Sequence, residues 1–542
     1  MPLLTGGQTL VESLKRHNVD TLFALPGIQN DALFNALYDT RGALRVIHPR
    51  HEQGAAYMAL GYAKSTGRVG AYAVVPGPGF LNTTAALATA YAANARVLCI
   101  TGQIPSANIG RGYGLLHEIP DQFAILRGLT KWCAHISHPS EIQRAVDEAF
   151  YQLHTGRPRP VALEIPTDVL AQESEIFFAN APSTYPALEP DPRAIEHAAQ
   201  LLCEARKPLI MIGSGVEDAR AELIALAEML QAPVVAASSG KGIIDSRHYL
   251  ALSAAEGNRL WAEADVVLGI GTRMYRPLVA WGADDALKII RIDVDAQEIA
   301  RVRAPTLGIV ADARRALASL REAVCARGIA RESREKELRA LKEEFEEEYA
   351  KIQPQFDFLR AIRSALPDDG IFVDEMTQVG YAAYFAFPAY HPRTLITSGY
   401  QGTLGYGFAT ALGVKVAHPD KAVVSINGDG GFMYNVQELA TAVLHKINLV
   451  AIVFNDNAYG NVLRMQKENY GGRVIATDLH NPDFVKLAAA FGARGLRATT
   501  PSELRVALAD AFAHPAPTLI EVPVGEMPRP HIFFQMTRVR GK

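Results

Sequence analysis

Short apolar runs alternate with amphipathic stretches along almost the whole chain. In the first third, the apolar runs fall at residues 21–24, 45–48, 70–75, 97–101 and 161–165. Amphipathic segments such as 8–17 and 52–66 lie between them, bounded by glycine and proline turns. Runs of this length suit buried parallel strands, and the amphipathic segments suit helices that cover the faces of a sheet. The pattern therefore predicts an α/β chain with doubly wound parallel sheets.

The middle and last thirds continue the alternation. The apolar runs of the middle third lie at 208–212, 265–270 and 288–293. A third unit with the same pattern begins near residue 354. The stretch 172–191, which contains Pro and Ser, is typical of a linker, and a charged helix predicted at 332–351 is typical of a solvated connector. Because 542 residues are too many for one core, we expect three doubly wound parallel-sheet domains, of which the first and last are related.

Composition and charge narrow the possible partners. The chain is 49% hydrophobic and 20% charged, as is usual for a globular protein, and its net charge of −3 gives no electrostatic reason to expect nucleic acid or an anionic membrane. No apolar run has membrane-spanning length, and the first residues suit an amphipathic helix rather than a signal peptide. The four cysteines have no metal or redox spacing, so we expect reduced core thiols. These features predict a cytoplasmic protein that acts on a small molecule.

The segment 421–462 contains the most informative motif. An apolar strand at 421–426 leads through Gly428-Asp429-Gly430-Gly431 into a helix, and a second strand at 449–454 ends at Asn455-Asp456-Asn457-Ala458. The helix is predicted to bury a stripe of Phe432, Val436, Leu439, Ala440 and Val443. Backbone N–H groups at a glycine-rich helix start bind phosphate oxygens, and the carboxylate of Asp429 can bind a hard cation such as Mg²⁺. A lone Gly-Asp-Gly is more often a structural turn, but its pairing with the Asn/Asp cluster favours a metal-bound diphosphate.

Further motifs carry a family resemblance. They are Leu25-Pro26-Gly27, Pro49-Arg50-His51-Glu52-Gln53-Gly54-Ala55, Gly77-Pro78-Gly79, Gly402-Thr403-Leu404-Gly405 and Asn435-Val436-Gln437-Glu438-Leu439. With the diphosphate motif, they make the chain resemble the thiamine diphosphate enzymes of the acetolactate synthase, pyruvate oxidase and benzoylformate decarboxylase group. The resemblance implies a pyrimidine-binding domain (1–175), a central domain (190–330) and a diphosphate-binding domain (355–542).

The same resemblance implies the cofactor and metal contacts. Mg²⁺ would be held by Asp429, Asp456 and the carbonyl of Ala458, where Asp456 replaces the usual asparagine. Leu404 would be the apolar wedge between the two rings of thiamine diphosphate, and Gly402 would offer its carbonyl to the exocyclic amino group. The remaining implied cofactor contacts are Thr377, Gln378, Gly428, Gly430, Gly431, Met433 and Tyr459.

Glu52 is the implied catalytic carboxylate, because thiamine diphosphate is activated when a carboxylate protonates the far nitrogen of its pyrimidine ring. A simple alternative is that Glu52 caps the helix predicted at 52–66. The family places the residues that correspond to Glu52 and Asp429 on different subunits. The resemblance therefore implies a homodimer as the minimum unit and a tetramer as the common assembly.

The substrate-facing candidates are less like those of acetolactate synthases. They are Ile28, Gln29, His117, Asn461 and Met465. His117 stands where acetolactate synthases have Gln, and it is either a proton donor or acceptor or a neutral hydrogen-bonding spacer. Met465 replaces a typical Trp and Asn461 an apolar residue, which argues against strict acetolactate synthase activity.

The resemblance implies addition of the cofactor to a 2-oxo acid, loss of CO₂ to give an enamine, and then protonation or ligation to a second carbonyl compound. The first hypothesis is therefore a 2-oxo acid decarboxylase or carboligase. Alternatives are a C–C bond hydrolase or lyase that cleaves a diketone or 2-hydroxyacyl compound, a flavin-dependent 2-oxo acid oxidase, and a cofactor-free paralogue, against which Glu52 and Asp429 argue. FAD is possible, because Gly240-Lys241-Gly242 and Gly271-Thr272-Arg273 stand where flavin-binding relatives contact it, but we do not expect it.

Overall fold

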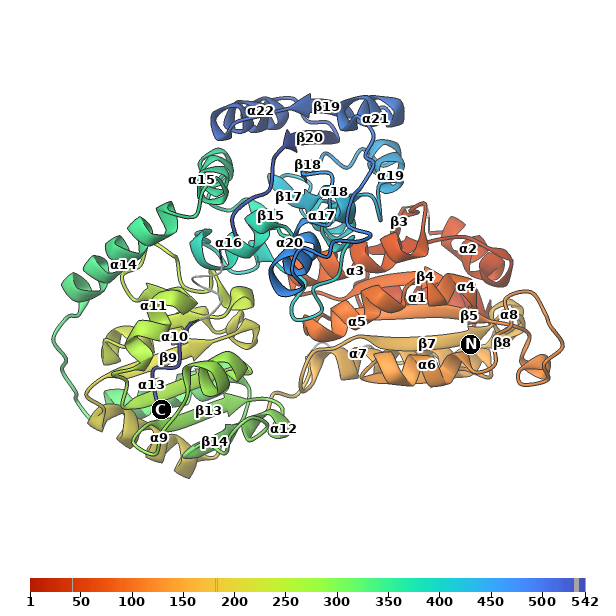
Figure 1. The fold of residues 1–542 in the computed structure, drawn as a ribbon. Helices are drawn as coiled ribbons and strands as arrows, with labels where there is room; N and C mark the ends of the chain where they lie inside the picture. Colours follow the sequence, from red (N-terminus) through yellow and green to blue (C-terminus); the bar gives the residue numbers. More distant parts are fainter. Residues whose placement is uncertain (41, 181, 183, 531–535, 542) are drawn as a thin grey trace.

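The chain forms three α/β domains, each built on a six-stranded parallel sheet (Figure 1). The computed structural model describes residues 1–40, 42–180, 182, 184–530 and 536–541. In Figure 1 the central domain (green) and the N-terminal domain (red to orange) lie side by side, and the C-terminal domain (cyan to blue) lies above both. The predicted fold class is confirmed. The domain limits 1–175, 190–330 and 355–542 stay a prediction.

The N-terminal sheet has the strand order β3-β2-β4-β5-β7-β6. Its strands are β2 (Thr21–Ala24), β3 (Arg45–Ile47), β4 (Gly70–Val74), β5 (Val97–Gln103), β6 (Trp132–His135) and β7 (Val161–Pro166). The helices of this domain are α1 (Gly6–Arg16), α2 (Asp31–Tyr38), α3 (Glu52–Thr66), α4 (Pro78–Leu81), α5 (Thr84–Ala92), α6 (Gln122–Leu129), α7 (Ile142–His154) and α8 (Thr167–Ala171). A short antiparallel pair, β1 (Leu3–Thr5) with β8 (Glu173–Glu175), brings the two ends of the domain together.

The C-terminal sheet has the order β16-β15-β17-β18-β20-β19, which is the N-terminal order when the strands are numbered within each domain. Its strands are β15 (Ile371–Val373), β16 (Leu395–Ile396), β17 (Val423–Gly428), β18 (Val450–Asn455), β19 (Arg494–Arg497) and β20 (Thr518–Pro523). The helices are α15 (Gln355–Ala365), α16 (Gln378–Ala386), α17 (Tyr406–Ala417), α18 (Asp429–Phe432), α19 (Glu438–Leu444), α20 (Gly460–Asn469), α21 (Phe484–Phe491) and α22 (Pro501–Ala513). The shared order supports the prediction that these two domains are related.

The central sheet has a different order, β11-β10-β9-β12-β13-β14, which is that of dinucleotide-binding folds. Its strands are β9 (Pro208–Ile212), β10 (Val234–Ala236), β11 (Ala251–Leu252), β12 (Val266–Ile270), β13 (Lys288–Asp293) and β14 (Leu307–Val310). The helices are α9 (Pro192–Glu204), α10 (Arg220–Leu230), α11 (Ala254–Trp261), α12 (Ala296–Ile299) and α13 (Ala313–Cys325). The charged helix α14 (Glu335–Ala350) connects this domain to the last one.

Three local predictions are corrected. The helix after the glycine turn is two helices, because α18 ends at Phe432 and α19 begins at Glu438; Leu439 is buried, whereas Ala440 is only half-buried. The predicted linker 172–191 contains strand β8, and its positions 181 and 183 lie outside the described residues. Cys325 is exposed and is not a core thiol.

Among the described residues, no helix has the length and apolar character needed to cross a membrane.

The N-terminal and C-terminal domains share one hydrophobic core, in which α3 crosses α17. At the crossing, a Cβ atom on Gly61 would overlap the carbonyl oxygen of Thr410, and a Cβ on Gly413 would overlap that of Met58. The two backbones can therefore approach this closely only because both residues are glycines. This crossing fixes the helix that begins with Glu52 against the helix that follows Gly405.

Gly413→Ala should destabilise the protein by about 1–3 kcal/mol, because the added methyl group forces the two helices apart. Thermal unfolding measures the effect. Gly128→Ala is the matched control: it lies in α6, where no atom is within 4 Å of an added Cβ, and it should be neutral or stabilising. Equal unfolding temperatures for Gly413→Ala and wild type would show that the crossing does not depend on glycine.

Candidate active site

The predicted diphosphate segments meet where the strand order of the C-terminal sheet reverses. β15 and β17 are neighbours in the sheet although β16 lies between them in the sequence, and open α/β sheets bind ligands at the carboxyl ends of such strands. Thr377 follows β15 and Gly428 ends β17; a Cβ on Gly428 would lie 3.5 Å from the Thr377 side chain. The structure therefore brings together two segments that are about fifty residues apart in the sequence.

Both segments lead into helix starts, which suits an anion. Thr377 caps α16, since its hydroxyl accepts a hydrogen bond from the Gly380 N–H at 2.8 Å. The side-chain oxygen of Gln378 accepts a hydrogen bond from Arg464 at 3.1 Å, which leaves its N–H groups as donors. The other helix start, at α18, is rich in glycine, and Gly430 has to be a glycine, because a Cβ there would lie 2.7 Å from the ring of Tyr459. Two sets of donors can thus face one phosphate group.

The candidate metal ligands lie at the ends of β17 and β18. Asp429 is 2% exposed, and its carboxylate accepts a hydrogen bond from Asn481 at 2.6 Å. Burial and the neighbouring Asp429 carboxylate raise the pKa of Asp456 to about 6. Burial likewise raises the pKa of Asp429. Two neighbouring carboxylates whose ionisation is disfavoured form a site that a hard divalent cation would stabilise.

Further oxygen atoms surround the carboxylate pair. The Asn481 amide also donates to the side-chain oxygens of Asn455 at 3.1 Å and Asn457 at 3.3 Å. Ala458 forms an isolated bridge with Asp478, and the hydrogen bonds of that bridge use the carbonyls of Thr477 and Asn457 rather than that of Ala458. No three His, Cys, Asp or Glu side chains form a metal cluster within the described part of the chain. The donor set is thus two carboxylates plus neutral oxygens, which fits Mg²⁺ completed by phosphate oxygens.

The loop that carries Leu404 is held by a pair of buried side chains. The Gly405 N–H donates to Glu375 at 2.7 Å, and the Gly405 carbonyl accepts from the Asn435 amide at 2.6 Å. Burial raises the pKa of Glu375 to about 8. Leu404 itself is half-buried, whereas Gly402 is exposed. These contacts tie the predicted wedge residue to the turn between α18 and α19, where Met433 is also exposed.

Glu52 is the first residue of α3, but it is not the helix cap. His51 caps the helix, because its Nδ1 accepts the Gln53 N–H at 3.1 Å. One Glu52 oxygen accepts a hydrogen bond from the Asn82 amide at 2.9 Å, and the other lies 3.6 Å from where a Cβ on Gly79 would be. The carboxylate is therefore directed to the turn after β4, where the N-terminal strand order reverses between β2 and β4. This position suits a functional carboxylate better than a cap.

Two substrate-facing candidates contact each other beside that turn. His117 Nδ1 lies 3.0 Å from the side-chain oxygen of Gln29, and the Gln29 amide donates to the Leu116 carbonyl at 3.0 Å. Gln29 is buried, whereas Ile28 is 68% exposed. The loop passes close to the turn, since a Cβ on Gly77 would overlap the His117 carbonyl.

The other two substrate candidates, Asn461 and Met465, lie on α20 of the C-terminal domain, where Met465 is 49% exposed. They belong to the same domain as Asp429 and not to that of Glu52. Among the described residues, no hydrogen bond joins the Glu52 group to the Asp429 group. A single chain therefore carries both halves of the predicted site in two domains.

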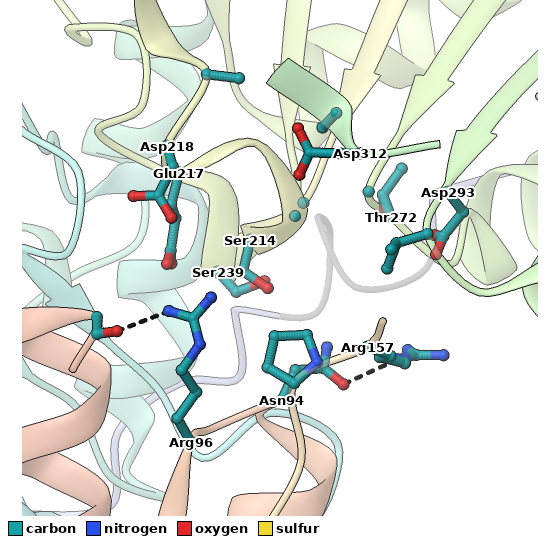
Figure 2. A pocket seen from close by; sticks show the side chains of 18 of the residues that line it. Asn94, Arg96, Arg157, Ser214, Glu217, Asp218, Ser239, Thr272, Asp293 and Asp312 are labelled. Atoms are coloured by element: carbon teal, nitrogen blue, oxygen red, sulfur yellow. Dashed lines mark hydrogen bonds between the residues drawn. The ribbon is translucent and has the colours of Figure 1, made fainter. Parts of the chain in front are cut away.

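A separate cavity of about 480 Å³ lies where the N-terminal and central domains meet the C-terminal domain, which contributes Arg393, Thr397, Gly399 and Tyr400 to its lining. Figure 2 shows Arg96 pointing toward Ser214 and Ser239, and Arg157 bonded to Asn94. Of the two blocks predicted to contact FAD, Gly271-Thr272-Arg273 lines this cavity. Lys241 does not, because its buried amine donates to the carbonyls of Ala383, Phe385 and Phe387 at the end of α16. Whether FAD binds stays a prediction.

Two features define an α/β enzyme with a phosphate-binding C-terminal domain. The strand order reverses in both the N-terminal and the C-terminal sheet, and the carboxylates of Asp429 and Asp456 form a pair. Protein-family models agree: the N-terminal TPP-binding, central and C-terminal TPP-binding domains of thiamine pyrophosphate enzymes match residues 4–125, 195–320 and 376–522. The chain therefore belongs to the thiamine pyrophosphate enzyme family, and thiamine diphosphate is its cofactor.

Curated relatives cover nearly the whole chain. Acetolactate synthase of Arthrospira platensis is 34% identical over 96% of this chain and 94% of its own length. A probable 2-ketoarginine decarboxylase of Pseudomonas aeruginosa is 33% identical over 96% of this chain and 94% of its length. The acetolactate synthase large subunit of Haemophilus influenzae is 31% identical over 95% and 93%. The enzyme thus has both carboligases and a decarboxylase among its relatives.

Asp429→Ala should abolish Mg²⁺-dependent retention of thiamine diphosphate, because the mutant loses a buried carboxylate of the predicted metal site. Equilibrium binding of the cofactor with and without Mg²⁺ measures this. Asp420→Ala is the charge-matched control, since Asp420 is exposed just before β17, at the other end of the same strand. Wild-type cofactor affinity in Asp429→Ala would refute the assigned site.

Proposed function

We propose that the protein is a thiamine diphosphate- and Mg²⁺-dependent 2-oxo acid decarboxylase or carboligase of the acetolactate synthase-like type. The observation that carries the proposal is the convergence of Asp429 and Asp456 beside the glycine-rich start of α18. Membership of the thiamine pyrophosphate enzyme family identifies the cofactor. The oxygen atoms around these carboxylates support the proposal that Mg²⁺ binds there.

Each half of the site would hold a different part of the cofactor. Asp429, Asp456 and the Ala458 carbonyl would hold Mg²⁺. The diphosphate would lie against the helix starts, near the residues Thr377, Gln378, Gly428, Gly430, Gly431 and Tyr459. Leu404, Gly402 and Met433 would contact the rings. The fit is supported by Asp429 and Asp456, whose raised pKa values a bound cation would lower.

When bound, thiamine diphosphate supplies an electron sink for cleavage of a bond next to a carbonyl group. Glu52 would share a proton with the pyrimidine ring nitrogen. Its Oε2 is engaged by Asn82, which leaves Oε1, next to the glycine turn at Gly79, as the free atom for that proton.

His117 is proposed as the proton acceptor or donor toward the substrate. Because the Gln29 amide donates to the Leu116 carbonyl, the Gln29 oxygen must accept, and the proton of a neutral His117 is assigned to Nδ1. Nε2 is then the atom left to take a proton from the substrate. Ile28, Asn461 and Met465 would shape the rest of the substrate pocket.

We further propose that the active site forms between two chains. The Glu52 group and the Asp429 group lie in different domains and make no hydrogen bond to each other among the described residues. The family resemblance, which places the residues that correspond to Glu52 and Asp429 on different subunits, makes a homodimer the minimum unit and a tetramer the expected assembly. A cytoplasmic location, no nucleic-acid or membrane partner and independence from FAD remain predictions. No specific observation favours a C–C bond hydrolase or lyase that acts on a diketone or 2-hydroxyacyl compound, or a flavin-dependent 2-oxo acid oxidase, over this function.

Glu52→Gln should retain cofactor binding but slow the exchange of the thiazolium C–H proton for deuterium, because the amide cannot share an acidic proton with the ring nitrogen. A positioned acid–base group is worth about 10²- to 10⁴-fold in rate. Exchange is followed by quenched-flow NMR of the bound cofactor. Glu12→Gln, a surface substitution on α1, is the control. If Glu52→Gln exchanges at the wild-type rate, the activating carboxylate must be a different residue.

A further inference from the structure

We propose that Glu438 is a positioning residue for Glu52, which it holds in place from the C-terminal domain of the same chain. The inference rests on the proposed role of Glu52. Glu438 is the first residue of α19 and is fully buried, yet its carboxylate bonds to the N-terminal domain. Figure 1 shows α19 directly above β3 and the start of α3.

The contacts fall on the two residues that precede Glu52. One Glu438 oxygen accepts the backbone N–H of Arg50 at 3.0 Å, and the other accepts that of His51 at 3.0 Å. The Thr441 hydroxyl completes the site, donating to the Glu438 carboxylate at 2.6 Å. Both carboxylate oxygens are therefore used, and both backbone donors lie in the turn that leads into α3.

The turn is fixed from the other side by its own residues. The His51 side chain accepts the Gln53 N–H, so the backbone is tied immediately before and immediately after Glu52. Glu438 also packs against the first turn of α3, because a Cβ on Gly54 would lie 2.6 Å from its oxygen. The position of Glu52 thus depends on a carboxylate whose hydrogen bonds, among the described residues, go to Arg50, His51 and Thr441 and not to the Glu52 side chain or its partner Asn82.

A side chain with two acceptor oxygens satisfies this arrangement, and an amide does not. Two backbone N–H groups need two acceptors, whereas a glutamine amide offers one oxygen and turns N–H donors toward the second backbone N–H. Burial raises the pKa of Glu438, while its hydrogen bonds and the nearby Arg50 guanidinium oppose that rise. Glu438→Gln keeps the size of the side chain and should release one end of the turn.

The first test reads the contact itself in the full-length protein without cofactor. Hydrogen–deuterium exchange by mass spectrometry should show slow exchange for the backbone amides of residues 50 and 51 in wild type. At least one of these amides should exchange about tenfold faster or more in Glu438→Gln, because the single amide oxygen can accept only one of the two bonds. Thr441→Val is the matched control, since it removes the third partner of Glu438 and leaves both backbone bonds in place. Unchanged protection of these amides in Glu438→Gln would overturn the inference.

The second test is a double-mutant cycle on the exchange of the thiazolium proton. Glu438→Gln alone should slow that exchange about tenfold or more, but it should add less than about twofold in a Glu52→Gln background, because it acts through Glu52. A merely structural role would slow both backgrounds equally and would overturn the inference. If Glu438→Gln does not fold, Glu438→Asp serves, because it keeps the charge but is too short to reach both N–H groups.

The two failures are distinguishable. Wild-type thiazolium exchange in Glu438→Gln, together with slow exchange in Glu52→Gln, would overturn only the role of Glu438. Wild-type exchange in Glu52→Gln would remove the proposed function of Glu52 and, with it, this inference.

Discussion

The site depends on two carboxylates that the parallel sheet forces together. β17 and β18 are paired in register, with Gly428 opposite Phe454, so the residues that follow both strands emerge at the same edge. Asp429 and Asp456 therefore meet in a partly buried place, where burial raises the pKa of both and the Asp429 carboxylate further raises that of Asp456. Such a pair costs stability unless a cation neutralises it. The oxygen-rich surroundings, the glycine turn and the helix starts are all consistent with a Mg²⁺-bound diphosphate at this edge.

The remaining architecture places the second half of the site. The N-terminal and C-terminal sheets share one strand order, and each presents its functional turns where that order reverses. The glycine crossing of α3 and α17 sets the spacing of the two domains, and Glu438 joins them at the turn before Glu52. The central sheet has a different order, and its own reversal point faces the cavity that contains Ser214 and Thr272. The molecule thus has two related cofactor domains and one domain of another type.

Much of the fold could be predicted from local patterns. Four predicted elements coincide with those of the structure: 21–24 with β2, 52–66 with α3, 208–212 with β9 and 288–293 with β13. In these segments a continuous apolar run or an uninterrupted helical pattern is enough to determine the secondary structure. The single helix predicted after Asp429 was wrong, since the Asn435 amide bonds to Gly405 in the turn between two shorter helices. Periodicity could not reveal Asn481, Glu375 or Glu438, because their partners lie far away in the sequence. The cofactor residues were predicted from motif order, not from periodicity.

The most direct test of the account is the release of CO₂ from a panel of 2-oxo acids by the purified protein, followed by identification of the products. The account predicts CO₂ release that requires both thiamine diphosphate and Mg²⁺ and stops when the metal is chelated. The organic product should be an aldehyde, a 2-hydroxy ketone or a 2-hydroxy-3-oxo acid. Release that continues after complete removal of divalent metal would contradict the assigned metal site. No CO₂ from any 2-oxo acid, with hydrolysis of a diketone instead, would contradict the proposed function.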